Sequence, residues 1–193
     1  MPLNSSPPTV KRADARRNRD SILSAARSAF ADPDASVSMA EISRRAGVGM
    51  ATLYRNFPSR RELLEALYAA EVDAVCDAAK IASGASPGAA LRAWLHQFFA
   101  FGASKKHLAA ELLTHVNSDS PVFNDNRTRV LAAGRPLFDA AQRVHQIRDD
   151  LTLEQALDML VSIATIDGNA RYQEPILQTV LDGLALPAVP SDD

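Results

Sequence analysis

Apolar residues recur along most of the chain with helical spacing, and proline, glycine and serine residues separate the periodic stretches. Ile22, Ala26, Ala29 and Phe30 place one apolar stripe on an expected helix that starts near Ala15. The Asp-Pro-Asp-Ala-Ser segment at 32–36 ends this helix. Residues 1–14 are rich in Pro, Ser, Lys and Arg, so we expect them to form a flexible basic arm.

The next two expected helices are short and well delimited. Ser38 and Glu41 have the spacing of a capping box, in which each side chain accepts a hydrogen bond from the other residue's backbone N–H. Gly47 suits the turn before a second short helix at 50–56, which Pro58 ends. Ser59 and Glu62 then form a further capping box at the start of a long helix that continues to about residue 82.

Five further helical segments are expected after a linker at 83–88. They lie at about 87–102, 105–117, 121–146, 152–167 and 174–186, and no run alternates like a β-strand. We therefore predict an all-α chain of about nine helices. Its expected parts are the arm at 1–14, a three-helix domain at 15–65 that continues into the long helix, a second helical domain at 87–187 and a tail at 188–193.

Charge is distributed unevenly along a chain whose net charge is only −2. Residues 1–64 hold 11 Lys and Arg against 6 Asp and Glu, whereas residues 65–193 hold 10 against 17. The first part therefore suits a polyanion such as DNA, and the second part does not. A single cysteine indicates a reducing compartment, and no apolar run reaches the length of a membrane span. We expect a cytoplasmic protein.

Two short helices joined by a glycine-containing turn are typical of a helix-turn-helix, whose second helix enters the major groove of DNA. The apolar residues of this region are expected to face inward, namely Ile42, Ala46, Val48, Leu53 and Phe57. Arginine and threonine hydrogen-bond base edges or phosphates, methionine contacts the thymine methyl group, and a tyrosine hydroxyl reaches phosphate. The candidate DNA contacts on the outer face are Gly49, Met50, Thr52, Tyr54 and Arg55.

Arginines flank this region on both sides. Arg44 and Arg45 lie on the first short helix, where a positioning helix meets the DNA backbone. Arg60 and Arg61 stand in the first turn of the long helix, where a cation opposes the helix dipole, so a phosphate would compensate them. The competing interpretation of the arginines is a solvated or ion-paired surface, and that of Tyr54 is a place in the domain core.

The same residues resemble the DNA-binding region of the tetracycline-repressor (TetR) family. The resemblance rests on residues 40–48 and 51–60 followed by Leu63 and Leu64. It implies a homodimeric, ligand-responsive bacterial transcription regulator with an all-α effector and dimerisation domain. It also implies that Tyr54 and Arg60 meet phosphates and that Met50, Thr52 and Arg55 reach bases. The sequence departs from the residues common in the family at Gly49, Met50 and Arg60.

A single helix-turn-helix makes few base contacts, so two copies spaced by one turn of DNA are needed, and this requires a dimer. The last two expected helices are apolar on more than one side, which favours packing against a second subunit. The candidate interface residues are Leu153, Leu157, Leu160, Val161, Ile176, Val180 and Leu184. A wholly intramolecular core is the competing interpretation.

Aromatic residues gather in the second domain and suggest a pocket for a small molecule, although aromatic residues at helical spacing belong more often to a core. The candidate pocket residues are Trp94, His96, Phe98, Phe99, His115, Phe123 and Phe138. Because no helix of this domain carries a large excess of charge, we expect an uncharged or weakly polar effector.

An enzyme is the main competing class of protein. The four histidines show no paired metal-ligand spacing, Cys76 has no histidine nearby in sequence, and no glycine-rich phosphate loop is present. We therefore expect no catalytic residue, no metal and no cofactor. The expected function is a repressor that binds a pseudo-palindromic DNA operator as a homodimer and is released by a small molecule. An activator, or a regulator without an effector, remains the alternative.

Overall fold

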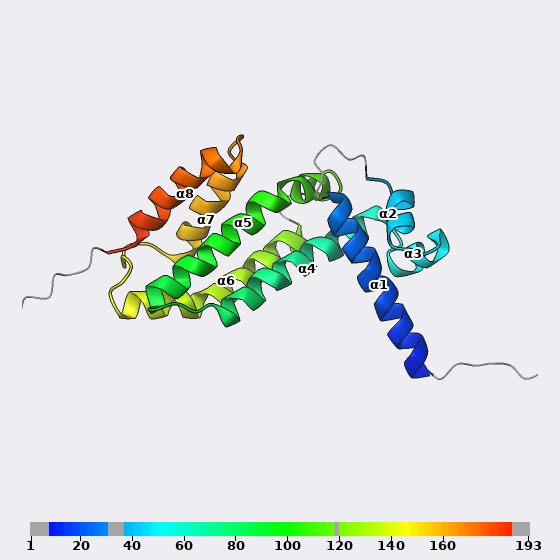
Figure 1. Cartoon of the computed structure of the whole chain (residues 1–193), viewed down its shortest axis with the longest axis horizontal. Coiled ribbons are helices and arrows are strands. Elements are labelled where there is room, and N and C mark those ends of the chain that lie inside the picture. The colour runs from blue at the N-terminus through cyan, green and yellow to red at the C-terminus, as the bar shows by residue number, and fades with distance from the viewer. Residues whose placement is uncertain (1–7, 31–36, 118–119, 187–193) are drawn as a thin grey trace, which may run out of the picture. The chain divides into compact units, whose positions relative to one another are not determined.

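The computed structural model describes residues 8–30, 37–117 and 120–186, and every element in these ranges is a helix (Figure 1). The first four helices are α1 (Pro8–Phe30), α2 (Met39–Arg45), α3 (Met50–Asn56) and α4 (Arg60–Ile81). The other four are α5 (Pro87–Leu113), α6 (Pro121–Arg143), α7 (Leu153–Thr165) and α8 (Ala170–Leu184). The prediction of an all-α fold is confirmed, with eight helices in the described residues.

Several helix boundaries differ from those expected, and two of the differences are large. The segments at 87–102 and 105–117 form the single helix α5, because Gly102 and Ser104 continue the helix without a proline to end it. Helix α1 starts at Pro8, whereas apolar periodicity detects it only from Ala15. Residues 8–14 have only Val10 and Ala13 as apolar residues that could mark a helical face, too few for periodicity to detect. Three expected features lie outside the described residues, namely the first part of the arm at 1–7, the break at 32–36 and the tail at 188–193.

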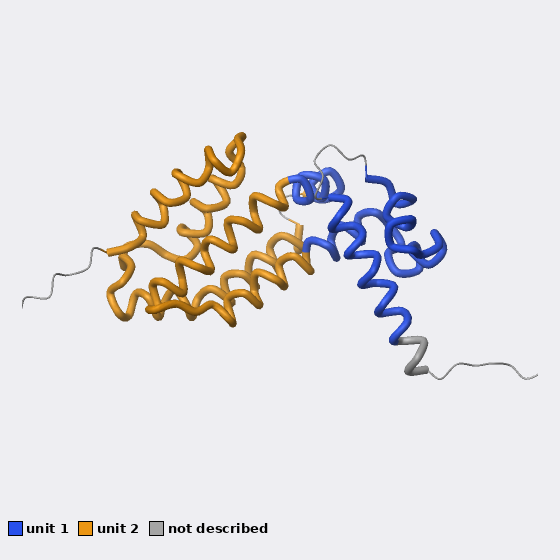
Figure 2. Tube along the Cα trace, viewed as in Figure 1, with its two compact units in different colours: residues 1–68, 107–116 blue, residues 69–106, 117–193 orange. Residues whose placement is uncertain are grey.

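The chain divides into two compact units (Figure 2). Unit 1 comprises residues 1–68 and 107–116, and unit 2 comprises residues 69–106 and 117–193. Helices α4 and α5 each contribute residues to both units, so neither unit is one continuous stretch of the sequence. None of the helices in the described ranges is both long and apolar enough to cross a membrane.

Unit 1 is built on a small apolar core that the first four helices share. Apolar burial of this kind supplies most of the stability of short helices, which are marginal by themselves. The side chains that are at most 1% exposed include Ile22, Ala26, Ala29, Ile42, Leu53, Phe57, Leu63 and Leu64.

Unit 2 has its own core, in which the central aromatic residue is Trp94 of α5. The indole Nε1–H donates a 3.1 Å hydrogen bond to the backbone carbonyl of Val75 in α4. Helices α7 and α8 pack side by side as an antiparallel pair (Figure 1). Thr152 and Gln155 form a full capping box at the start of α7.

Candidate DNA-binding surface

The turn between α2 and α3 is held by one buried serine and one glycine. Ser43 is 5% exposed, and its hydroxyl donates a 2.6 Å hydrogen bond to the backbone carbonyl of Val48. Gly47 has φ +65°, a left-handed conformation that glycine adopts at little cost. The sequence predicts the role of Gly47 but not that of Ser43, because a serine inside a helix carries no local signal of the bond that it makes.

Helix α3 is anchored on one side, which leaves the other side exposed. Leu53 and Phe57 are buried together with Ile42 of α2. The Arg19 guanidinium of α1 lies 4.4 Å from the centre of the Phe57 ring, and its Nη1 donates a 3.4 Å hydrogen bond to the Asn56 carbonyl. Arg19 therefore supports the end of α3.

The candidate DNA contacts of α3 lie on its open side. Met50 is 39% exposed and Tyr54 is 45% exposed, which places Tyr54 outside the core. Gly49 and Arg55 are also exposed, and Thr52 is half-buried. The Nη2 of Arg55 donates a 2.9 Å hydrogen bond to the Thr52 hydroxyl, so these two polar side chains form one group on the exposed face.

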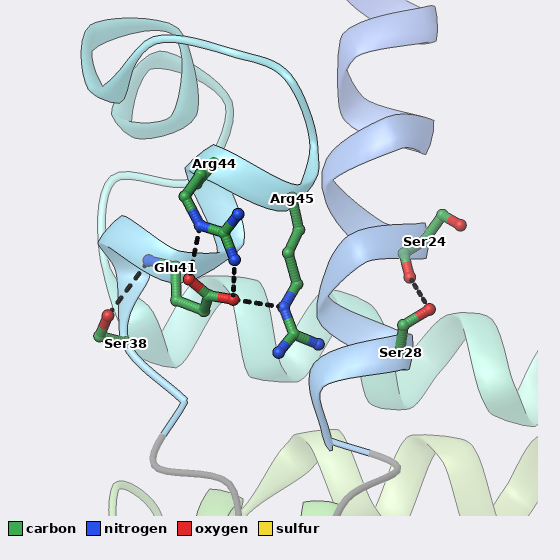
Figure 3. Close-up of polar contacts among 6 residues, drawn as sticks. All are labelled: Ser24, Ser28, Ser38, Glu41, Arg44 and Arg45. Atoms are coloured by element: carbon green, nitrogen blue, oxygen red, sulfur yellow. Dashed lines mark hydrogen bonds and ion pairs between the residues drawn. The ribbon is translucent and has the colours of Figure 1, made fainter.

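A single carboxylate on α2 holds two arginines, as Figure 3 shows. Arg44 donates two hydrogen bonds to the Glu41 carboxylate, 2.9 Å from Nε and 2.7 Å from Nη2. Arg45 donates a third of 2.6 Å from its Nε. Glu41 thus differs from the expected capping box: the Ser38 hydroxyl accepts from the Glu41 N–H at 3.1 Å, but the Glu41 carboxylate bonds the arginines instead of the Ser38 N–H.

The two guanidinium groups lower the pKa of Glu41 from 4.5 to about 2, mainly through the hydrogen bonds from Arg44 and Arg45. Glu41 therefore stays ionised at every pH at which the protein would work. A lowered pKa stabilises the folded state at any pH above the ordinary pKa of the group, which is 4.5 here. This stabilisation is lost as the pH falls from 4.5 towards 2. The side chain of Arg44 remains 75% exposed despite the pair.

Arg60 is placed differently from the other candidate DNA contacts. Its guanidinium donates hydrogen bonds of 3.0 and 2.8 Å to Glu111 at the end of α5 and one of 2.6 Å to the Val37 carbonyl. It also lies 5.4 Å from the centre of the Phe30 ring. Glu111, 51 residues away, supplies the negative charge that we expected from a phosphate. Arg61, by contrast, is exposed and pairs with Glu65 within α4 at 2.8 Å.

The candidate interface residues of the last two helices fall into two groups. Leu153, Leu157, Leu160 and Leu184 are at most 3% exposed within the single chain, so they belong to the core of unit 2. Val161 is 44% exposed, and Ile176 and Val180 are half-buried. Only these last three are available to a partner.

The candidate pocket residues are divided between the two units. The core of unit 2 contains Trp94, Phe98, Phe99 and Phe138, while Phe123 is half-buried. His115 is exposed and belongs to unit 1, whereas the other candidate pocket residues belong to unit 2. His96 lies 3.4 Å from Gln178 of α8. Among the described residues, no group of three His, Cys, Asp or Glu side chains is arranged to hold a metal ion.

Both parts of the chain match models of known protein families. Residues 22–67 match the model described as bacterial regulatory proteins of the tetR family. Residues 86–186 match the model described as the C-terminal domain of SbtR-like transcriptional regulators. A search of curated proteins found no match.

Several solved structures are similar over nearly their whole length. A TetR transcriptional regulator from Streptomyces coelicolor is 35% identical, with a TM-score of 0.72, and the match covers 89% of this chain and 99% of that one. A TetR transcription regulatory protein from Mycobacterium vanbaalenii is 32% identical, with a TM-score of 0.71, and covers 91% and 99%. A TetR family regulator from Marinobacter aquaeolei shares the fold, with a TM-score of 0.60 and 23% identity. The match covers 92% of this chain and 99% of that one.

Proposed function

Because the chain belongs to the TetR family of DNA-binding transcriptional regulators, we propose that it is a repressor that binds a pseudo-palindromic operator as a homodimer and is released by a small molecule. The observation that supports this most is the open face of α3, where Met50, Tyr54 and the hydrogen-bonded pair of Thr52 and Arg55 stand clear of the core. The chain acts in the cytoplasm, without a metal or cofactor.

The base-reading side chains in this proposal are Met50, Thr52 and Arg55. An arginine fork suits the two acceptors of guanine in the major groove, and a methionine suits a thymine methyl group. Tyr54, Arg44 and the backbone of Gly49 contact phosphates, which fix the register of α3 on the duplex. Arg60 contributes indirectly, because its bonds to Glu111 and Val37 hold the start of α4 within unit 1.

Dimer formation is proposed through one face of α8 and the neighbouring surface of α7. Tyr172, Ile176, Val180 and Gly183 follow one another at helical spacing, and Tyr172 is 60% exposed. A β-carbon at Gly183 would have no atom within 4 Å among the described residues outside the backbone of its own helix. Val161 extends the apolar surface on α7. An uncharged, partly apolar and partly exposed face of this kind suits an identical face related by a two-fold axis.

DNA selected from a random pool by the full-length protein is expected to contain two inverted half-sites whose centres are about 34–36 Å apart, one turn of the duplex. The Gly183→Arg variant should be monomeric and should lose most of its affinity for this DNA. Arginine is a better helix former than glycine, so α8 itself is not weakened. Sedimentation velocity and a gel-shift titration measure the two effects.

Glu174→Arg serves as the matched control, because it places the same arginine side chain on the opposite side of α8. It should stay dimeric and bind the selected DNA normally. A monomeric wild-type protein, or selected DNA with a single asymmetric site, would contradict the proposal. Repression is tested by transcription in vitro from a promoter that carries the selected site, and transcription that rises with added protein would indicate an activator.

Glu41→Gln is expected to increase the affinity for DNA of random sequence. The substitution removes a negative charge from the surface that meets the phosphates, and it releases the guanidinium groups of Arg44 and Arg45 from their carboxylate. The slope of log affinity against log salt should steepen by about 0.9 for each additional phosphate contact. Fluorescence anisotropy with a labelled duplex of random sequence measures both quantities.

Asp77→Asn is the control for this experiment, since it releases Lys80 from a similar pair in unit 2. It should leave the affinity and the salt slope unchanged. If Glu41→Gln instead weakens binding without changing the salt slope, then Glu41 positions the arginines for DNA rather than competing with the phosphates.

A further inference from the structure

Unit 2 contains a pocket that none of the candidate pocket residues lines. It has a volume of about 260 Å³ and lies between the start of α5, the loop that follows α6 and the end of α8. Its apolar walls are Leu91, Leu95, Ile147, Leu181 and Leu184, which are all at most 5% exposed to solvent. The aromatic core around Trp94 lies outside this lining, so the pocket is a separate feature of the domain.

The walls of the pocket are held in place by backbone hydrogen bonds. The Arg148 N–H donates to the Leu184 carbonyl at 3.0 Å, and the Leu186 N–H donates to the Gln146 carbonyl at 3.1 Å. The Gln146 side chain accepts a 2.7 Å hydrogen bond from the Gly88 N–H at the start of α5. These bonds join the loop after α6 to both helices, so the pocket is formed before any ligand arrives, as most small-molecule sites are.

Arg92 is the one charged residue among those that line the pocket. Its guanidinium donates to Gln178 at 2.5 Å and forms an ion pair of 2.7 Å with Asp182. Asp182 is 68% exposed, and an ion pair with an exposed partner contributes little stability. A second carboxylate that arrives with its apolar part in the pocket can therefore replace Asp182 at low cost and bind the guanidinium with two parallel hydrogen bonds.

We propose that this pocket binds a small monocarboxylate, with the apolar body against the leucine walls and the carboxylate on Arg92. The pocket is slightly smaller than the roughly 300–1,000 Å³ of sites for drug-sized ligands, so it suits a small molecule. An amine would be repelled by Arg92, and a ligand with several charges would leave most of them against leucine side chains. The chemistry differs from the uncharged effector that the charge distribution of the sequence suggests.

The role of this ligand as the effector rests on the proposed function, whereas its binding does not. Helix α5 carries Leu91, Arg92 and Leu95 in the pocket wall, and the same helix carries Glu111, which holds Arg60 in unit 1. A ligand that favours one position of α5 therefore acts on a helix that also contacts the DNA-binding unit, as coupling between two sites requires.

Calorimetric titration of the full-length protein with octanoate and with 1-octanol tests the binding site. Octanoate should bind saturably with one site per chain, and 1-octanol should bind about tenfold or more weakly, because it lacks the charge that Arg92 pairs with. Arg92→Gln should abolish the preference for octanoate. Asp182→Asn should strengthen octanoate binding, since it removes the competing carboxylate and leaves Arg92 in place.

Equal binding of the two probes, no saturable binding, or unchanged affinity in the Arg92→Gln variant would overturn the proposal. Circular dichroism of each variant confirms that the fold is kept, and Asp182→Asn provides a test that does not depend on removing a pocket residue. The affinity for the selected operator is then measured with and without octanoate. Binding of octanoate without a change in operator affinity supports the site and contradicts its role as the effector. If the ligand-free protein binds no operator, the proposed function is contradicted, but the carboxylate site is not.

Discussion

Replacing Trp94 with alanine is expected to lower the free energy of unfolding of unit 2 by about 3–5 kcal/mol. The indole is fully buried and donates a hydrogen bond to the Val75 carbonyl of α4. Its far edge lies against Gly134 of α6, so this one side chain joins three helices. Urea denaturation followed by circular dichroism measures the change. The melting temperature should fall by about 2–4 °C for each kcal/mol.

Gly134→Ala tests the same contact from the opposite side. A β-carbon at Gly134 would lie 2.5 Å from Cζ3 of Trp94 and closer still to Cη2, so the indole must move. We expect a cost of about 1–3 kcal/mol, although alanine is the better helix former. In a Trp94→Phe background the smaller ring leaves room, so the same substitution should cost much less. If the effects of Gly134→Ala and Trp94→Phe on the free energy of unfolding add to within about 0.5 kcal/mol in the double variant, the packing of Trp94 on Gly134 is contradicted.

Arg55→Ala is expected to weaken binding to the selected operator about 10- to 100-fold and to relax its sequence preference at one base pair of each half-site. Arg55 is exposed on α3, and the Thr52 hydroxyl restrains its guanidinium, so little further ordering is needed when it meets a base. Binding to DNA of random sequence should change far less. Fluorescence anisotropy with the operator and with single-base variants of it measures the discrimination.

Two other arginines provide the controls for Arg55→Ala. Arg143→Ala removes an exposed charge from unit 2 and should leave operator binding unchanged. Arg60→Ala should lower the thermal stability, because it leaves Glu111 and the Val37 carbonyl without their partner, and it should weaken binding to all sequences alike. If Arg55→Ala lowers the affinity for operator and random DNA by the same factor, Arg55 contacts phosphate and not a base.

Local sequence features predicted the small helices well because their determinants are local. Ser38, Gly47 and Pro58 mark boundaries that depend on backbone conformation within a few residues, and the structure has α2 and α3 between them. The capping residues of α7 behave in the same way. Glu41 is the exception, because two sets of hydrogen-bond donors lie within reach of its carboxylate. It accepts from Arg44 and Arg45 in the next turn instead of from the Ser38 N–H.

Periodicity was less informative about which apolar face meets which neighbour. Leu153, Leu157 and Leu160 were expected at a subunit interface, and they lie in the core of their own chain. An apolar stripe shows that a side of a helix is buried, but it does not show whether the covering surface belongs to the same molecule. The aromatic residues of α5 carried the same ambiguity between core and pocket.

The sequence by itself determined the all-α class, the helix-turn-helix and the family to which the chain belongs, because these depend on residue spacing and on motifs of contiguous residues. The tertiary structure alone decided the partners of residues far apart in the chain. It joined Arg60 to Glu111, packed Trp94 on Gly134 and placed Arg92 at a pocket between three segments. Such contacts arise from the packing of whole helices, and no spacing within one helix encodes them.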